Sequence, residues 1–241
     1  MKTLGIIQPC KIGDIIICLP IAKYFYDKNI KVFWPIKSSY YEMFKRHVDY
    51  VEFIPIDNDH SKCVENSKRS VKDSDIIDLS FHFPNTDPLS IQYNNQISYT
   101  FDEFKYKLAD VPFDNKWKLE IKRDIDREIL LYNKLIKNKD FIVYQNISSD
   151  WAVKYDLNKE DKKYDIINVK DYTDDVFDWI TILEKANKLI LVESCFSNLV
   201  DQLHIKTNKT LLVKHGYYGS LLEDNKTFKG MPRLREDWNL I

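Results

Sequence analysis

The feature that most constrains the fold of this chain is the alternation of short apolar runs with helical patterns, separated by short turns. Thr3–Gln8, Lys31–Pro35 and Tyr50–Ile56 are short runs of β-branched and aromatic residues, which favour strands. Ile15–Lys28 and Ser38–His47, which lie between these runs, are predicted to be helices. Strands that alternate with helices predict an α/β fold, with a parallel sheet covered on both faces.

The rest of the first half continues this pattern less regularly. Pro20 lies inside the first helical pattern, which predicts either a kink or a helix that begins only near Cys18. Further strands are expected at Asp75–Leu79 and, as an edge strand, at Trp117–Ile121; helices are expected at Tyr99–Leu108 and Asp126–Lys137.

A second α/β pattern begins near residue 140. Its strands are expected at Asp140–Asn146, Tyr164–Val169, Lys188–Val192 and Lys209–Val213, and its helices at Thr173–Ala186 and Ser194–His204. The two halves share an architecture but no sequence repeat. We therefore expect two domains, residues 1–130 and 131–241, that face each other across a ligand-binding cleft.

Charge and hydropathy exclude several classes of protein. The chain has 36 basic and 37 acidic residues and a net charge of −1, which argues against a protein that coats nucleic-acid backbones, although a local basic site remains compatible. No apolar run approaches the roughly 18–20 residues of a membrane helix. The N-terminus lacks the apolar segment of a secretory signal. These features predict a cytoplasmic protein with no transmembrane segment.

The metal-ligating residue types are spread along the sequence. The four cysteines, Cys10, Cys18, Cys63 and Cys195, form no CxxC pair, which predicts reduced thiols and no zinc site. Asp57, Asp59 and His60 lie in a polar loop without the spacing of a metal site. We therefore expect neither a bound metal nor another cofactor.

The first candidate site is the turn Lys11-Ile12-Gly13-Asp14, directly after the first predicted strand. In open α/β sheets, loops at the carboxyl ends of strands open into the binding crevice. Gly13 can bring the backbone close to a ligand, and we expect Lys11 and Gly13 to contact phosphate. Asp14 either caps the following helix or acts as a general base that takes a proton from a hydroxyl. The turn matches neither the GxGxxG dinucleotide fingerprint nor a P-loop.

The second candidate site is the start of a helix after the apolar run Lys188–Val192. Its sequence is Glu193-Ser194-Cys195-Phe196-Ser197-Asn198. The hydroxyls of Ser194 and Ser197, together with the unpaired N–H groups of a first helical turn, favour a phosphate. A capped helix without a ligand is the alternative.

Other polar residues follow neighbouring strands of the second half. Gln145, Ser148 and Ser149 come at the end of one strand and His215 after another, so we expect all four near the Ser194 turn. Polar residues are also common in turns, and a single histidine is most often structural or solvated. A role without a ligand therefore stays open for these four residues.

These two turns together resemble a known family. Ile6–Pro20, with its Gly13-Asp14 pair between strand and helix, resembles the N-terminal segment of ADP-heptose:lipopolysaccharide heptosyltransferases, which are GT-B glycosyltransferases of family 9. Lys185–Leu199 resembles the strand and D-S-G-x-x-H-L-A turn of the same family. The two matches occur in the same order in the family. Residues 57–130 carry no comparable match.

The resemblance implies two Rossmann-like domains in the GT-B arrangement and a metal-independent glycosyltransferase. A sugar would pass from a nucleotide-sugar donor to the hydroxyl of a carbohydrate or other acceptor. Asp14 would be the general base. The donor would bind in the second domain, with Ser194, Cys195 and Phe196 at the diphosphate, flanked by Gln145 and by Ser148 or Ser149.

The chain departs from the family motif at three positions. Glu193 replaces its Asp, Cys195 its Gly and Asn198 its His, so the sugar and the nucleotide are left open. Two alternatives remain. One is a nucleotide- or sugar-binding module that has lost the chemistry. The other is a sugar transferase acting on modified DNA bases, which the net charge does not support.

Overall fold

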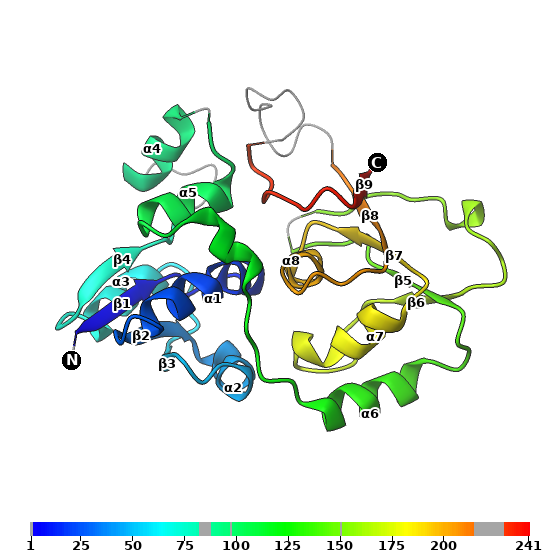
Figure 1. The fold of residues 1–241 in the computed structure, drawn as a ribbon, viewed down its shortest axis with the longest axis horizontal. Coiled ribbons are helices and arrows are strands. Elements are labelled where there is room, and N and C mark those ends of the chain that lie inside the picture. Colours follow the sequence, from blue (N-terminus) through cyan, green and yellow to red (C-terminus); the bar gives the residue numbers. More distant parts are fainter. Residues whose placement is uncertain (1, 82–87, 97, 150, 215–228) are drawn as a thin grey trace. The chain divides into compact units, whose positions relative to one another are not determined.

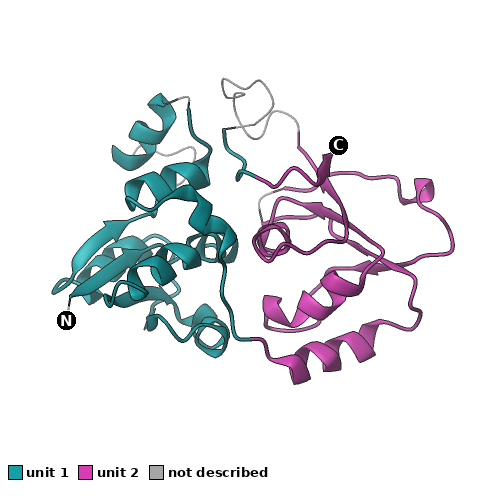
Figure 2. Ribbon diagram, in the orientation of Figure 1, with its two compact units in different colours: residues 1–122, 218–233 teal, residues 123–217, 234–241 magenta. Residues whose placement is uncertain are grey.

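The computed structural model describes residues 2–81, 88–96, 98–149, 151–214 and 229–241 (Figure 1). The chain divides into two compact units: unit 1 is residues 1–122 with 218–233, and unit 2 is residues 123–217 with 234–241 (Figure 2). The change of unit after residue 122 comes shortly before the boundary expected at residue 130. Near the C-terminus, residues 229–233 belong to unit 1, and the chain then returns to unit 2.

Within its described residues, unit 1 contains a parallel sheet with the strand order β3-β2-β1-β4. The strands are β1 (Thr3–Ile7), β2 (Lys31–Lys37), β3 (Glu52–Ile56) and β4 (Asp75–Asp78). The helices are α1 (Ile12–Tyr26), α2 (Ser38–His47), α3 (Cys63–Ser70), α4 (Pro88–Asn95) and α5 (Phe101–Leu108). The sequence predicts all of these strands, but neither α3 nor α4.

Helix α1 overturns one of the two expectations for Pro20, that of a helix that begins only near Cys18. The helix begins at Ile12 and continues through Pro20. Proline removes the hydrogen bond to the carbonyl four residues earlier, that of Ile16. Every residue from Ile15 to Ala22 is buried, and most helical stability in proteins comes from such packing, so burial outweighs the missing bond.

The expected edge strand at Trp117–Ile121 is wrong. A short 3-10 helix, η1, covers Phe113–Trp117, and residues 118–124 belong to no strand. Alternating hydrophobicity makes a strand only where a neighbouring strand accepts its hydrogen bonds. Here the partners lie outside strands: the Lys122 N–H donates to the carbonyl of His47, the last residue of α2, at 2.8 Å, and the Tyr50 hydroxyl donates to the Glu120 carbonyl at 3.0 Å.

A close approach at Gly5 fixes the packing of strand β1. A Cβ atom at this position would lie 2.6 Å from the Cγ2 atom of Val71, which directly follows α3. No side chain fits at that distance unless Val71 moves. Glycine therefore lets the end of α3 lie directly against the centre of the sheet.

In the part of unit 2 that the structure describes, the sheet is again parallel, with the order β6-β5-β7-β8-β9. Its strands are β5 (Phe141–Tyr144), β6 (Asp165–Asn168), β7 (Lys188–Val192), β8 (Asn208–Leu212) and β9 (Trp238–Leu240). Its helices are α6 (Ile125–Leu135), α7 (Ile180–Lys185) and α8 (Cys195–Gln202), with short 3-10 helices η2 (Leu157–Lys159) and η3 (Val176–Trp179). Strand β9 is the one that the sequence does not predict.

The expected helix Thr173–Ala186 is shorter than predicted. The side chain of Asp175 accepts a hydrogen bond from the Phe177 N–H and starts η3, after which α7 runs to Lys185. A cap inside the predicted helix therefore moves its start.

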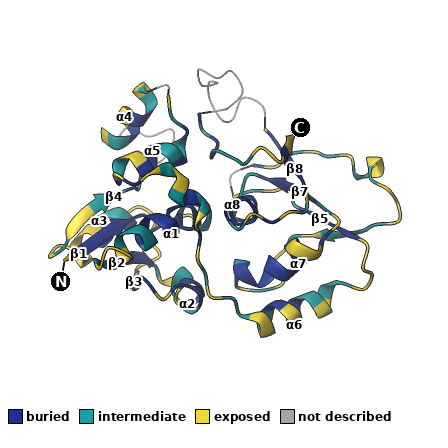
Figure 3. Ribbon diagram, in the orientation of Figure 1, coloured by how far each residue is buried: buried dark blue, intermediate teal, exposed yellow. Residues whose placement is uncertain are grey.

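The inner strands of both sheets form the buried centre of their units (Figure 3). In β1 and β7 every residue except the first is buried, as expected for the inner strands of a parallel sheet covered on both faces. None of the helices described is long and apolar enough to cross a membrane. The predicted α/β architecture with parallel, Rossmann-like sheets is confirmed for each unit.

Candidate functional site

In unit 1 the candidate site lies where the order of the strands reverses. The chain builds β2 and β3 on one side of β1 and then adds β4 on the other side. The crevice at the carboxyl ends of strands flanking such a reversal is the usual ligand site of an open α/β sheet. The turn that carries Lys11, Gly13 and Asp14 follows β1, and Leu79 follows β4.

Asp14 is not the cap of helix α1. Lys11 is the N-cap residue, and Asp14 is the third residue of the helix, with 16% of its side chain exposed. The carboxylate is close to two groups: Gln8 Nε2 lies 3.5 Å from Oδ2 and Lys105 Nζ lies 4.0 Å from it. A partly exposed carboxylate that does not cap its helix can accept a proton from a ligand.

Lys105 connects the residues around Asp14 by hydrogen bonds. Its side chain reaches from α5 and is fully buried, and its ammonium group donates to Gln8 Oε1 at 2.7 Å and to the Leu79 carbonyl. The ammonium group also lies 4.7 Å from the centre of the Phe81 ring. Lys105 thus joins the ends of β1 and β4 directly beside Asp14.

Sequence reasoning missed both Gln8 and Lys105. A signal exists for Lys105, since it lies four residues after Phe101 on the helix face that carries the apolar residues of α5. A charged residue on an apolar face is buried only where it has partners. Gln8 gives no comparable signal in the sequence.

Lys11 has a strained backbone. Its φ is 62°, in the left-handed region, and its side chain is exposed. Among the described residues other than glycine, a positive φ also occurs at Asn29, Asp110 and His204. Asparagine, aspartate and histidine adopt this region more readily than lysine does. Strain of roughly 1–3 kcal/mol tends to occur at functional sites. Gly13 follows as the second residue of α1 and is half-buried.

In unit 2 the strand order also reverses, between β5 and β7. The residue after β5 is Gln145, and the turn after β7 contains Ser194. The Ser194 hydroxyl donates a hydrogen bond of 2.7 Å to Gln145 Oε1. The structure therefore brings together these two predicted residues, which lie 49 positions apart.

Hydroxyl groups cap the start of helix α8. Ser194 is the N-cap, and its Oγ accepts the Phe196 N–H at 3.2 Å. The Ser197 hydroxyl accepts the Ser194 N–H at 2.9 Å and donates to the Ser194 carbonyl at 3.0 Å. The capping that the sequence allowed is therefore present, and it fixes the geometry of the turn.

The other predicted residues of this turn surround the cap. Desolvation and the nearby Glu193 carboxylate raise the pKa of Cys195 to about 12, so its thiol stays protonated at neutral pH. Asn198 is buried, and its Nδ2 lies 3.5 Å from Glu193 Oε1. Cys195 is thus a neutral group here and not a thiolate nucleophile.

Ser148 and Ser149 belong to a short turn of their own. The Ser148 N–H donates to the Trp151 carbonyl at 2.8 Å, and its hydroxyl accepts the Trp151 N–H at 3.3 Å; Ser149 is exposed. Gln145, in the same segment, accepts the hydrogen bond from the Ser194 hydroxyl. His215 lies outside the described residues.

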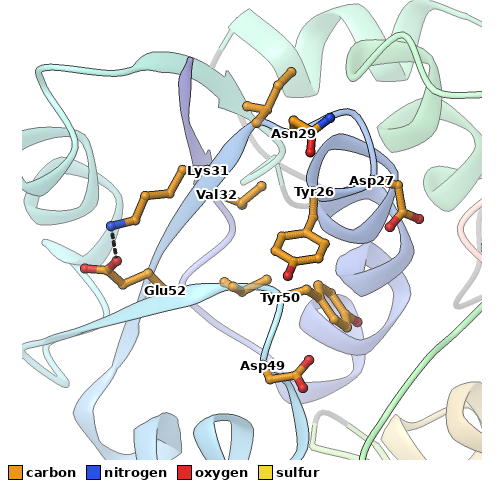
Figure 4. A pocket seen from close by; sticks show the side chains of 10 residues that line it. Tyr26, Asp27, Asn29, Lys31, Val32, Asp49, Tyr50 and Glu52 are labelled. Atoms are coloured by element: carbon orange, nitrogen blue, oxygen red, sulfur yellow. Dashed lines mark ion pairs between the residues drawn. The ribbon is translucent and has the colours of Figure 1, made fainter. Parts of the chain in front are cut away.

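A pocket of about 700 Å³ lies elsewhere in unit 1 (Figure 4). It is lined by the end of α1 and by the starts of β2 and β3, with Tyr26 and Tyr50 beside each other and an ion pair of 2.5 Å between Lys31 and Glu52. These are the amino ends of parallel strands, so the pocket lies at the edge of the sheet opposite the Asp14 turn. Ligands of open α/β sheets bind at the carboxyl ends.

The comparisons with known proteins find similarity in the fold but none at the level of a sequence family. No family model and no curated protein matches the chain. A family 9 glycosyl transferase from Veillonella parvula DSM 2008 matches with a TM-score of 0.63 and 10% identity, covering 100% of this chain and 86% of that chain. E. coli ADP-heptose lps heptosyltransferase II matches with a TM-score of 0.57 and 12% identity, covering 100% and 90%.

A further match is TibC from enterotoxigenic E. coli H10407, described as an iron-containing dodecameric glycosyltransferase. Its TM-score is 0.53 at 12% identity, and the match covers 98% of this chain and 70% of that one. At such low identity these matches establish the fold. The resemblance carried by the Asp14 and Ser194 turns is confirmed at the level of the fold: the chain has the fold of the family 9 glycosyltransferases.

Proposed function

We propose that this protein is a glycosyltransferase that moves a sugar from a nucleotide-sugar donor to an acceptor hydroxyl. The observation that carries the proposal is the Ser194–Gln145 hydrogen bond at the start of α8, at the strand reversal of unit 2. Proteins with this fold include TibC in complex with ADP-D-beta-D-heptose and E. coli WaaC with ADP. An ADP-linked sugar is therefore the first donor to test.

In this proposal unit 2 binds the diphosphate of the donor. The N–H groups at the start of a helix carry a partial positive charge of about half a unit, which favours a phosphate. Because Gln145 Oε1 accepts from Ser194, the amide nitrogen of Gln145 is the group that can donate to the ligand. These donors stabilise the leaving diphosphate, so the transfer step requires no divalent metal.

Unit 1 supplies the general base. Asp14 takes the proton of the acceptor hydroxyl while the hydroxyl oxygen bonds to the anomeric carbon. The bond between that carbon and the diphosphate breaks, and the nucleoside diphosphate leaves with the electron pair. Lys105 and Gln8 hold the carboxylate in place from the buried side. Lys11 and Gly13, in the same turn, would approach the substrates through their backbone.

The first experiment identifies the donor and then tests the base. ADP-, UDP-, GDP-, CMP- and dTDP-sugars are screened for a rise in melting temperature, since a ligand that binds the native state stabilises it. With the donor that binds, Asp14→Asn should lower turnover by about 10²–10⁴-fold. Donor affinity should stay unchanged, because the donor binds in unit 2.

Asp27→Asn is the matched control. Asp27 ends the same helix, is exposed and pairs with Lys23, so its loss should leave turnover unchanged. Near-normal turnover of Asp14→Asn would refute the role of the base. Donor binding without transfer or release of nucleotide under any acceptor would refute the transferase and identify a binding module instead.

A further inference from the structure

Three side chains that bind soft metals meet in unit 1, although the sequence predicts no metal site. The ligand atoms of Cys10, His60 and Cys63 all lie within 4.8 Å of one another. Cys10 and Cys63 are 53 residues apart, so no sequence spacing reveals the group. It is the one such cluster found in the described part of the chain.

Two segments of unit 1 supply these residues. Cys10 lies in the loop between β1 and α1, where its carbonyl accepts a hydrogen bond of 2.8 Å from Gln8 Nε2. Cys63 is the first residue of α3, and both cysteines are buried against Ile56. His60 lies one turn before Cys63 and is exposed. The cluster therefore has two buried sulfur atoms and an imidazole at the surface, where an ion can enter.

Cysteine sulfur and histidine nitrogen are the ligands of zinc sites, in which three protein ligands leave a fourth position for water or another group. Two thiolates and one neutral imidazole would balance the charge of a divalent cation. An ion must then displace two protons, as is usual for thiolate sites.

The distance between the Cys10 and Cys63 sulfur atoms determines how far they must move when a metal binds. The two sulfur atoms are 2.7 Å apart. Zn–S bonds of about 2.3 Å in tetrahedral geometry place two sulfurs about 3.8 Å apart, whereas a disulfide bond is about 2.05 Å long. Binding therefore requires the sulfurs to separate by about 1 Å, which small rotations of the two side chains supply. The position of His60 favours the metal, because a disulfide makes no use of an imidazole.

We propose that Cys10, His60 and Cys63 form a binding site for a divalent cation of the zinc class. Binding exchanges two thiol protons for one ion, with no change in oxidation state. The ion would join the loop that leads to Asp14 with the start of α3, and so stabilise the candidate catalytic turn. The site can be tested independently of the proposed sugar transfer, because its test measures bound metal and free thiols.

The test uses Co²⁺ as a spectroscopic probe of the reduced, metal-free full-length protein. We expect one Co²⁺ per chain, with sulfur-to-metal charge-transfer absorption in the near ultraviolet and the visible bands of a tetrahedral site, both lost when Zn²⁺ is added. His60→Asn should weaken binding by more than the roughly 10–100-fold that loss of an outer-shell partner costs. His204→Asn, a second exposed histidine, should bind as the unaltered protein does.

Counting free thiols separates a metal site from a disulfide. The reduced chain has four cysteines, and Zn²⁺ should protect two of them until EDTA is added. Cys63→Ser should abolish this protection. The proposal is overturned if the reduced protein gives no cobalt spectrum, if His60→Asn binds normally, or if the two thiols disappear on air oxidation and return only with a reductant in a protein that takes up no Co²⁺.

Discussion

The ammonium group of Lys105 lies 2.7 Å from Gln8 Oε1, and both side chains are fully buried. This bond connects α5 with the end of β1 across 97 residues, and the same ammonium group also binds the Leu79 carbonyl after β4. Because Gln8 Nε2 also faces Asp14, the position of the carboxylate depends on this connection. Lys105 is therefore a positioning residue for the proposed base.

Replacing this lysine tests that role. Lys105→Met keeps the length of the side chain but leaves Gln8 Oε1 and the Leu79 carbonyl without their donor, which should cost about 1–3 kcal/mol of unfolding free energy. We expect kcat to fall by about tenfold while the KM for the donor stays the same. Lys107→Met, an exposed position on the same helix, should change neither. A rise in donor KM with unchanged kcat would contradict the positioning role.

The Ser194 hydroxyl should matter for both stability and donor binding. Ser194→Ala removes the N-cap of α8, which should lower the unfolding free energy by about 1 kcal/mol. It also removes the contact that orients Gln145, and we expect donor affinity to fall by about tenfold in calorimetric titration.

Asp124→Ala is the matched control for this cap. Asp124 caps α6 by accepting the Arg127 N–H at 3.3 Å, so its loss should cost a similar free energy without changing donor affinity. Equal donor affinities for the Ser194 and Asp124 variants would show that the α8 cap has no part in binding.

A buried ion pair anchors the C-terminal segment of unit 1. Asp102 and Lys116 are fully buried with 2.8 Å between Oδ2 and Nζ, and Asp102 also accepts the Arg233 N–H at 3.0 Å. Asp102→Ala leaves the buried Lys116 ammonium group without its carboxylate partner, although its hydrogen bond to the Arg233 carbonyl remains. This loss should destabilise the protein by about 3–5 kcal/mol in urea denaturation. Glu52→Ala, which breaks the exposed pair with Lys31, should cost less than about 1 kcal/mol. Similar losses for the two variants would contradict the argument from burial.

The Glu160–Lys188 pair should make stability depend on pH. Burial acts to raise the pKa of Glu160, but hydrogen bonds from Lys188, at 2.8 Å, and from Tyr155 hold it below its usual value. The folded pKa is thus lower than the unfolded one, near 4.3. The stabilisation is fully present above the unfolded pKa and is lost as the pH falls through the folded pKa.

Glu160→Gln removes this dependence. Its unfolding free energy should lie below that of the unaltered protein at pH 7, and the difference should shrink as the pH falls below about 4. Chemical denaturation at several pH values measures the difference. A gap that stays constant from pH 7 to pH 3 would show that the carboxylate makes no such contribution.

Local patterns predict most of the fold. Lys188–Val192 and Ser38–His47 form β7 and α2 within the expected bounds, because continuous apolar runs and helical periodicity act over neighbouring residues. Helix α3 escapes prediction since only Cys63 and Ser67 of its residues are buried, so it has no apolar stripe. Strand β9 exists through its pairing with β8, which its own three residues do not encode.

Part of the candidate site could likewise be predicted from the sequence, and part of it could not. Strand order places Asp14, Gln145 and Ser194 at the carboxyl ends of strands, and this could be argued from the sequence. The contacts of Lys105 with Gln8 and of Cys10 with Cys63 join residues 97 and 53 positions apart, and no local pattern specifies them. The cleft between the two domains stays a prediction.

The return of residues 229–233 to unit 1 means that the polypeptide passes between the units more than once. Lys229 Nζ donates to the Asn94 carbonyl at 2.8 Å, and Arg233 Nε pairs with Glu103 at 3.0 Å. A fragment that stops at residue 122 would therefore lack part of its own interior. Cleavage after residue 122 alone would not release unit 1, because the chain also joins the two units between residues 233 and 234.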